Sequence, residues 1–184
     1  MKHYQLKKYE SAEKVFSDAL EIRHRLAETN HEVFDSQIAM TLDSLGNLHR
    51  DLSKYNLAEM EYLQSLEIRR HLSEKNSKVF ELDLAKTLNN LGTLYIITAD
   101  FKSAYNVLYE AQDICRRIKS ICPGIFDSFL GDILTNLGLL CWTKMDFATA
   151  RKMLHEALEI YRRLNSKNPG VYESQIRKLM RFTS

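Results

Sequence analysis

The sequence predicts an all-α fold in which antiparallel helix pairs stack one upon another. A nine-residue pattern recurs every 46 residues, at 41–49, 87–95 and 133–141, and a fixed period of this size is typical of stacked-repeat proteins. Within the pattern, leucines recur at the spacing of one helix face. The 184 residues include only 2 prolines and 6 glycines, which favours helices over turn-rich β structure.

Composition excludes several classes of protein. With 45% apolar and 27% charged residues, the chain is typical of a folded globular protein. Its formal net charge of +2 gives no global reason to expect nucleic acid or an anionic membrane as a partner. No apolar run approaches the ~20 residues that cross a bilayer, and the N-terminus lacks the apolar core of a signal peptide. We therefore expect a cytoplasmic protein with no nucleic-acid and no membrane partner.

Each repeat unit predicts two helices, A and B. In the first complete unit, helix A is expected from about residue 31 to about residue 52, either unbroken or with a kink or restart near Asp35 and Ser36. At the following A-to-B junctions, Asp100 and Asp146 are expected N-caps, because a carboxylate can accept from the exposed amides of the first turn. Pro169 is expected at the first position of the last A helix, where its missing amide hydrogen costs nothing.

The units set the expected domain organisation. We expect a single array over 1–184, with a partial repeat at 1–29, complete repeats at 30–75, 76–121 and 122–167, and a partial repeat or capping helix at 168–184. Residues 1–8 match the tail of an A helix whose first half is missing. A stack must cover its terminal apolar faces. Either the chain is cut from a longer array, or the C-terminal helix caps it and the N-terminal end pairs with something else.

Glycines in the middle of the A helices indicate a close helix contact. A glycine there costs about 1 kcal/mol relative to alanine, so it needs a packing reason. We expect the glycines to face small residues of the B helices in three pairs: Gly46 with Ala58, Gly92 with Ala104, and Gly138 with Ala150.

The pattern resembles the tetratricopeptide repeat, which has Leu-Gly in helix A, aromatic residues after it and at the start of helix B, and a small-aromatic-small triplet in helix B. Tyr95 matches the first aromatic position, whereas His49 and Cys141 depart from it. The second aromatic position is filled by Tyr9, Tyr55, Phe101 and Phe147, and the triplet by Ala12, Phe16 and Ala19 and their equivalents. The family's usual unit has 34 residues, so the 46-residue unit is similar to the long kinesin-light-chain type.

This resemblance implies a right-handed superhelical solenoid whose A helices line a concave groove for a peptide or partner protein. Asparagine suits such a groove because its side chain both donates and accepts hydrogen bonds. The exposed side of the A helices therefore gives the candidate groove residues Asp43, Asn47, Arg50, Lys86, Asn89, Asn90, Thr93, Ile96, Asp132, Asn136, Leu139 and Trp142. For Trp142, packing against the helix of the next unit is an equal alternative. Acidic residues at groove positions argue against binding of a carboxylate-rich chaperone tail.

No pattern typical of catalysis, of a metal site or of a cofactor site occurs in the sequence. His49 is expected as a substitute for a core aromatic residue, and Cys115 and Cys141 as packing residues of helices. Arginine runs that follow Glu67, Asp113 and Glu159 are expected to pair with these acidic neighbours. We therefore expect no enzyme, no cofactor and no bound metal.

The sequence thus predicts a non-catalytic protein–protein interaction scaffold. One alternative is a self-association module that forms a homo-oligomer through open ends of the array. Another is a regulatory segment of a larger protein that could carry an enzyme. Recognition of RNA by helical repeats is disfavoured because the chain is nearly neutral.

Overall fold

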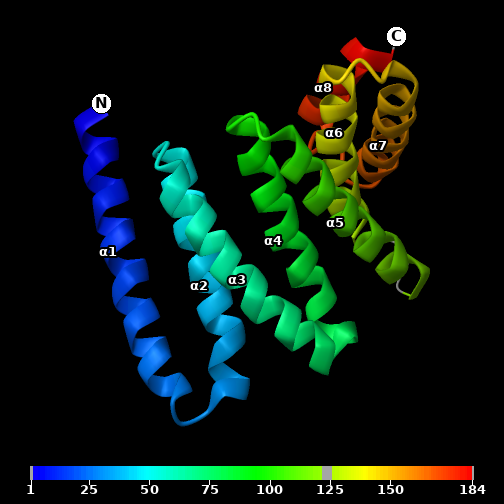
Figure 1. Ribbon diagram of the computed structural model, residues 1–184. Coiled ribbons are helices and arrows are strands. Elements are labelled where there is room, and N and C mark those ends of the chain that lie inside the picture. Colours follow the sequence, from blue (N-terminus) through cyan, green and yellow to red (C-terminus); the bar gives the residue numbers. More distant parts are fainter. Residues whose placement is uncertain (1, 122–125, 184) are drawn as a thin grey trace. The chain divides into compact units, whose positions relative to one another are not determined.

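The structure is a computed structural model that describes residues 2–121 and 126–183. Over these residues it is built of helices without strands, which confirms the all-α prediction. Within each of its two compact units, consecutive helices run antiparallel and are joined by short connections (Figure 1). The helices are α1 (Lys2–Ala27), α2 (His31–Asp51), α3 (Tyr55–Lys75), α4 (Ser77–Ile97), α5 (Phe101–Ile121), α6 (Asp127–Thr143), α7 (Phe147–Lys167) and α8 (Glu173–Thr183). None of these described helices is long and apolar enough to cross a membrane.

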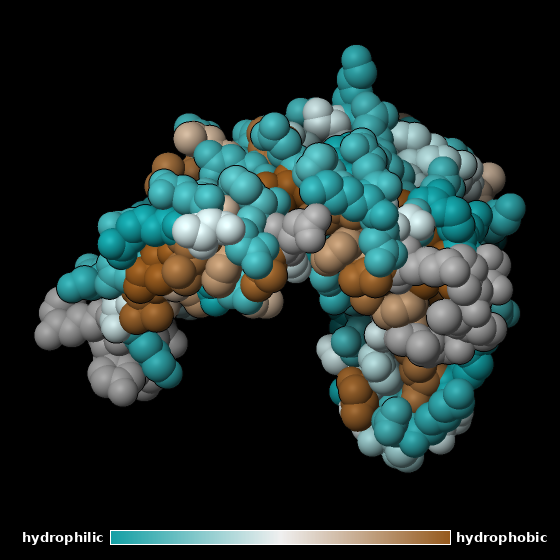
Figure 2. All heavy atoms as spheres, turned by 90° about the horizontal axis from the view of Figure 1, so that it is seen from below, coloured by the Kyte–Doolittle hydropathy of each residue, from teal (hydrophilic) through white to brown (hydrophobic). Residues whose placement is uncertain are grey.

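The helices form two compact units, Met1–Leu94 and Tyr95–Ser184. In the N-terminal unit, α2 packs against both α1 and α3. In the C-terminal unit, α6 packs against α5 and α7, and α7 also packs against α8. Seen from one side, mainly hydrophilic surface is interrupted by apolar patches (Figure 2). Each unit therefore buries its leucine-rich faces between neighbouring helices and still leaves apolar side chains at the surface.

Helix α2 shows how the pattern forms an A helix. Asn30 caps it, since its side chain accepts a hydrogen bond from the Val33 amide at 3.4 Å. The helix continues unbroken to Asp51, which excludes the alternative of a restart near Asp35. Its apolar residues at helical spacing are all buried, as expected for one face of an amphipathic helix: Ile38, Leu42, Leu45 and Leu48.

The A-to-B turns repeat one backbone feature that the sequence analysis did not predict. Ser53, Ala99 and Met145, 46 residues apart, have φ angles of 59°, 60° and 62°. This left-handed conformation ends helices, although glycine usually supplies it. After two of the turns, Asp100 and Asp146 cap the next helix by accepting from the Ser103 and Thr149 amides, both at 3.1 Å. These hydrogen bonds confirm the predicted caps. The pKa of both carboxyl groups is lowered, first by the side-chain hydroxyls of Ser103 and Thr149 and then by these amides.

The N-terminal helix differs from the prediction. Helix α1 runs unbroken from Lys2 to Ala27, so residues 2–8 do not form the tail of a separate A helix. In the other units, the left-handed backbone conformation of the turn residue is energetically unfavourable. That turn allows the B helix to fold back on the A helix of the same unit.

The last helix also begins later than predicted. Asn168 ends α7, with its amide donating to the Leu164 carbonyl at 3.0 Å, and Pro169 lies in the following turn. Gly170 has a φ of +89°, and the Tyr172 amide donates to Asn165 Oδ1 at 3.1 Å. This turn delays the start of α8 to Glu173, so the expectation of Pro169 at a helix start is wrong. The corresponding junction at Cys122 and Pro123 lies outside the described residues.

The helix glycines allow close contact, but with larger residues than predicted. A Cβ on Gly46 would lie 2.6 Å from the Tyr62 ring, and one on Gly138 would lie 2.6 Å from Leu154. The Ala150 carbonyl oxygen would lie 3.3 Å from the same Cβ on Gly138. Helical side chains point toward the helix N-terminus, so the residue one turn after the alanine covers the glycine. Gly46 therefore faces Tyr62 instead of the predicted Ala58, whereas Gly138 contacts both Leu154 and the predicted Ala150.

Candidate functional site

The N-terminal unit contains a pocket of about 290 Å³ between α2 and α4. Its lining includes three of the predicted groove residues, together with others that the sequence analysis did not select. Arg69 of α3 also lines the pocket, so three helices contribute to it. The lining residues are Ser36, Met40, Asp43, Ser44, Arg69, Asp83, Lys86 and Asn90.

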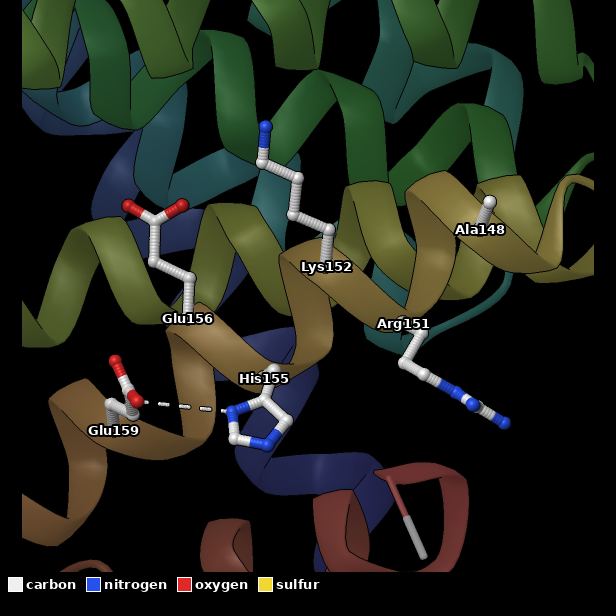
Figure 3. Close-up of a pocket in the computed structure, with 6 residues that line it drawn as sticks. All are labelled: Ala148, Arg151, Lys152, His155, Glu156 and Glu159. Atoms are coloured by element: carbon white, nitrogen blue, oxygen red, sulfur yellow. Dashed lines mark ion pairs between the residues drawn. The ribbon is translucent and has the colours of Figure 1, made fainter.

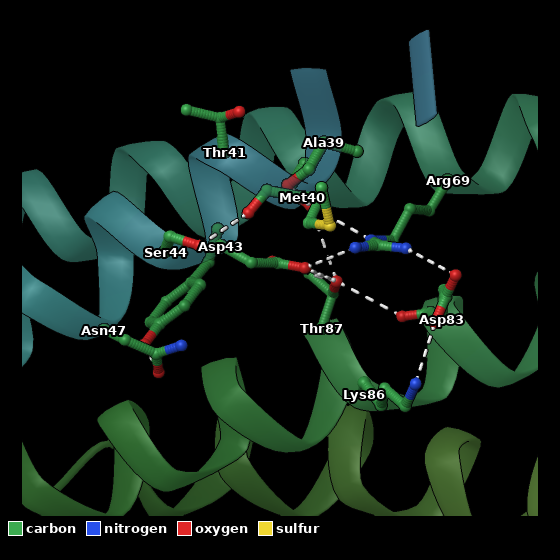
Figure 4. Close-up of polar contacts among 12 residues, drawn as sticks. Ala39, Met40, Thr41, Asp43, Ser44, Asn47, Arg69, Asp83, Lys86 and Thr87 are labelled. Atoms are coloured by element: carbon green, nitrogen blue, oxygen red, sulfur yellow. Dashed lines mark hydrogen bonds and ion pairs between the residues drawn. The ribbon is translucent and has the colours of Figure 1, made fainter. Parts of the chain in front are cut away.

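Arg69 joins the three helices that form this pocket. Its guanidinium is buried, with Nη2 2.7 Å from Asp43 Oδ2 and Nη1 3.3 Å from Asp83 Oδ2. Its Nε donates to Ser65 Oγ at 3.3 Å. Figure 4 shows the guanidinium lying between the two carboxylates, one on α2 and the other on α4. A buried guanidinium with two carboxylate partners fixes the spacing of these helices.

Asp43 is held inside the unit instead of standing free in a groove. Thr87 Oγ1 lies 3.0 Å from both of its carboxylate oxygens, in addition to the contact with Arg69. The residue is only 9% exposed. We therefore interpret Asp43 as a residue of the pocket wall. Its carboxylate oxygens already bind Arg69 of α3 and Thr87 of α4.

The rim of the pocket is more accessible. Met40 is 53% exposed. Lys86 extends from α4, with its Nζ 3.0 Å from Asp83 Oδ1 (Figure 4). Asn90 lies one turn further along α4. The four charged groups of the pocket are two carboxylates and two cations, so their formal charges cancel.

Four other predicted groove residues of the N-terminal unit have polar partners on α2, α3 or α4. Asn47 Oδ1 accepts a hydrogen bond from the phenolic OH of Tyr62 at 2.9 Å. Arg50 pairs with Asp51 at 3.1 Å. Thr93 Oγ1 donates to the Asn89 carbonyl at 2.9 Å. These four predicted residues do not line the pocket, and Ile96 lies half-buried near the end of α4.

Predicted groove residues on α6 belong to the C-terminal unit. Asp132 accepts from the Tyr161 hydroxyl at 2.6 Å, and Asn136 and Leu139 are half-buried. The Trp142 ring packs edge-on against Phe147 of α7 and Phe182 of α8, with centroid distances of 5.0 and 5.4 Å. The structure thus favours the alternative in which Trp142 packs against the helix of the next unit.

A second surface hollow, of about 500 Å³, lies on α7. All of its lining side chains project from this single helix (Figure 3). Its charges are mixed: His155 lies 3.8 Å from Glu159, and Glu156 pairs with Arg116 of α5 at 3.1 Å. A shallow face of one helix offers no convergent groups, so the pocket at Arg69 is the better candidate.

His49 is buried as predicted, but in a charged setting. Its Nδ1 lies 2.8 Å from Glu61 Oε2 and its Nε2 lies 3.0 Å from Glu13 Oε1. Lys54 Nζ is 3.0 Å from the Glu13 carboxylate. Burial opposes the charged imidazolium, but the hydrogen bonds to both glutamates outweigh it and raise the pKa of His49. The two carboxylates lie on opposite edges of the ring, and the described residues contain no group of three or more ligands suited to a metal ion.

The arginines and cysteines were predicted with partial success. Arg69, Arg116 and Arg163 pair with acidic residues of neighbouring helices, with Arg163 2.8 Å from Asp127. The predicted pairing with the preceding acidic residues of the same helix is therefore wrong in its partners. Cys115 and Cys141 are free and buried, as expected for packing residues. Burial raises the pKa of the Cys115 thiol to about 12. Cys122 lies outside the described residues.

Comparison with known families supports the helix-pair architecture. The model of the tetratricopeptide repeat family matches residues 38–77 and 130–169. The two matches begin two 46-residue periods apart. These two stretches are tetratricopeptide repeats. Such repeats generally mediate protein–protein interaction and are typically non-catalytic scaffolds.

One solved structure shows a similar fold. The crystal structure of BtubC (BKLC) from P. vanneervenii matches with a TM-score of 0.54 and 17% sequence identity. The match covers 95% of this chain and 81% of that chain. At this level of identity the likeness establishes the fold only. A comparison with curated proteins gave no match.

The residues that the sequence analysis missed are Arg69 and Asp83, which organise the pocket of this tetratricopeptide unit. One signal could have found the Arg69 pair. In the next two repeats, Cys115 and Tyr161 occupy the position of Arg69. Asn89 and Thr135 occupy the position of Asp43. An arginine and an aspartate that both occur in the same unit, and are absent from the next two, indicate a pair that belongs to that unit.

Proposed function

We propose that the pocket between α2 and α4 binds an extended segment of a partner protein and that the chain acts as a non-catalytic interaction scaffold. One observation carries the proposal: Asp43, Lys86 and Asn90, from two A helices, line one pocket above the buried Arg69. These positions lie on the side of the A helices that the sequence analysis selected for ligand binding.

The chemistry of the lining suits a peptide. The Asn90 amide can both donate to and accept from a peptide backbone. The exposed Met40 offers a flexible apolar contact that adapts to different side chains. Because the charges of the pocket cancel, we expect an uncharged polar or apolar ligand side chain at this point, since a charged one would lose its water without gaining a partner.

The buried network also favours binding through preorganisation. Arg69 holds Asp43 on α2 and Asp83 on α4 at fixed positions before any ligand arrives. A site formed in advance loses less conformational entropy on binding. The pocket therefore needs few contacts of its own to bind a short segment.

Selection from a displayed library of random peptides tests this proposal. Selected peptides are synthesised and their affinity is measured by fluorescence anisotropy. Met40→Ala and Asn90→Ala should each weaken binding about tenfold, which corresponds to about 1.4 kcal/mol. The matched controls are Met60→Ala on α3 and Asn106→Ala on α5, at exposed positions outside the pocket, and both should bind as the wild type does.

The opposite pattern would identify a different surface. If the selected peptides bind the Met40→Ala, Asn90→Ala double variant as tightly as the wild type, this pocket is not the site. Replacing Asn89, Asn90 and Thr93 together extends the test to the rest of α4. Circular dichroism of each variant checks that helicity is unchanged.

A further inference from the structure

Helix α3 carries three apolar side chains on its outer face, which we name the α3 stripe. Leu57, Met60 and Leu63 are 43%, 57% and 44% exposed. They stand three residues apart, so they follow one another along one side of the helix. A continuous apolar surface that stays open to solvent is typical of an interaction site.

The stripe is a feature of this unit and not of the repeat. At the same repeat positions the other B helices have polar or charged residues, with one tyrosine as the exception. These are Ser11, Lys14 and Ser17 on α1, Ser103, Asn106 and Tyr109 on α5, and Thr149, Lys152 and His155 on α7. Stacking of the helix pairs therefore does not require apolar residues here, and the stripe needs another explanation.

The other sides of α3 are already occupied within the N-terminal unit. Tyr62 packs over Gly46 of α2, and Arg69 pairs with carboxylates of α2 and α4. Successive residues of a helix are about 100° apart, so Arg69, nine positions after Met60, points in about the opposite direction. The stripe therefore faces away from the pocket between α2 and α4, and both surfaces can be occupied at once.

The residues around the stripe are arranged symmetrically about Met60. Glutamates stand one position away on each side, leucines three positions away and side-chain amides four positions away. In an antiparallel pair of identical helices, Met60 would meet its own counterpart. Leu57 would meet Leu63, and Asn56 would meet Gln64. An interface between two copies related by a twofold axis must be self-complementary in this way.

The charges beside the stripe also suit this antiparallel pair. Lys54 is the N-cap of α3 and makes no side-chain capping bond, so the first turn of α3 has exposed amides and is electropositive. Glu67 is exposed and stands seven positions after Met60, on the same side of α3. Seven positions before Met60 stands Ser53, next to Lys54. Glu67 of each copy would therefore lie near the electropositive end of the other copy's α3.

We propose that the α3 stripe binds the α3 stripe of a second copy of the chain, in an antiparallel dimer whose twofold axis passes beside Met60. One helix of each copy gives a smaller contact than that of obligate dimers, so the dimer dissociates on dilution. It carries two copies of the pocket between α2 and α4, which would increase avidity for a partner with two binding segments. Only this last consequence rests on the proposed function.

Sedimentation equilibrium of the 184-residue chain at several concentrations tests the proposal. We expect a reversible equilibrium between monomer and dimer. Met60→Glu should weaken the dimer at least about tenfold, because two carboxylates would face each other at the axis. Glu67→Lys should also weaken it, by repulsion from the other copy's Lys54. The matched control is Asn106→Glu, at the equivalent exposed position of α5, which should dimerise as the wild type does.

Cysteine crosslinking determines the orientation of the two helices. After mild oxidation, Met60→Cys should form a covalent dimer by itself. Leu57→Cys and Leu63→Cys should form one only when the two variants are mixed, whereas a parallel pair would crosslink each variant with itself. The wild type is the control, because Cys115 and Cys141 are buried.

Three results would overturn the proposal. The first is a chain that stays monomeric at every concentration, in which case the stripe serves a different protein. The second is a dimer that Met60→Glu leaves intact, which would place the contact on another surface. The third is the crosslinking pattern of a parallel pair. Circular dichroism of each variant checks that a lost dimer does not reflect lost helicity.

Discussion

Arg69 and Asp43 form a buried ion pair, with the guanidinium Nη2 2.7 Å from the carboxylate Oδ2. The pair links α3 to α2, and the same guanidinium reaches Asp83 on α4. Because these contacts join three helices and also line the pocket, the stability of the unit and the shape of its candidate site depend on the same side chains.

Removal of Arg69 should be strongly destabilising. Arg69→Ala would leave the Asp43 carboxylate buried without its cation, and breaking a buried pair in this way costs about 3–5 kcal/mol. Urea denaturation measures the loss of free energy of unfolding. Arg116→Ala, which removes an exposed pair with Glu156, is the control and should cost less than about 1 kcal/mol. Equal losses for the two variants would contradict the structural role of Arg69.

The His49 cluster should make stability depend on pH. The pKa of His49 is raised above its ordinary value of 6.5: burial alone would lower it, but the hydrogen bonds to Glu13 and Glu61 outweigh burial. The folded state therefore binds this proton more tightly. The resulting stabilisation is fully present below pH 6.5 and is lost as the pH rises through the folded-state pKa.

The two glutamates that contact His49 determine how stability changes at acidic pH. Hydrogen bonds from His49 and Lys54 lower the pKa of Glu13, so its stabilisation is present above its ordinary value of 4.5 and is lost in acid. Burial raises the pKa of Glu61, which makes its charged form unfavourable at higher pH. The advantage of the wild type over His49→Gln should therefore be larger at pH 5.5 than at pH 8, as measured by urea denaturation. In a Glu13→Gln, Glu61→Gln background this pH dependence should reverse, because burial then lowers the pKa of His49 with no glutamate to oppose it. Parallel pH curves for the wild type and His49→Gln would show that the cluster has no such effect.

Glycine at an A-to-B turn should stabilise the protein. Ala99 has a φ of 60°, and the left-handed conformation costs a residue with a Cβ about 1–2 kcal/mol. Ala99→Gly removes this cost but makes the unfolded chain more flexible, so we expect a net gain of about 0.5–1 kcal/mol in thermal or urea unfolding. Ala148→Gly, inside α7, should lose stability instead. A loss at position 99 would show that the turn is not strained.

Leucine at position 112 should also be stabilising. Gln112 is only 1% exposed, and its Nε2 atom has no hydrogen-bond partner among the residues that the structure describes. The same repeat position holds Leu20, Leu66 and Leu158. Since an unsatisfied buried polar group costs about 1–3 kcal/mol, Gln112→Leu should raise the free energy of unfolding by an amount in this range. A decrease would indicate that the amide is satisfied in solution.

The repeat period was sufficient to predict the helix pairs, because each unit contains the same spacing of buried leucines. Caps at Asp100 and Asp146 were also predictable, since they depend on a side chain and an amide three residues away. The pocket was predicted only in part. Lys86 and Asn90 follow from their place on an A helix, whereas Arg69 and Asp83 depend on contacts among α2, α3 and α4 that helix periodicity does not contain.

The sequence by itself determined the all-α architecture, the order of the helices and the position of most turns, because local spacing and capping chemistry decide these features. Only the tertiary structure decided that Asp43 forms an ion pair with Arg69 and that Trp142 packs against α7 and α8. It also decided that Val15, Ile22 and Leu26 of α1 are exposed. The reason is physical: whether a side chain on a helix is buried or open depends on the neighbouring helices, and the residues of those neighbours lie many positions away in the chain.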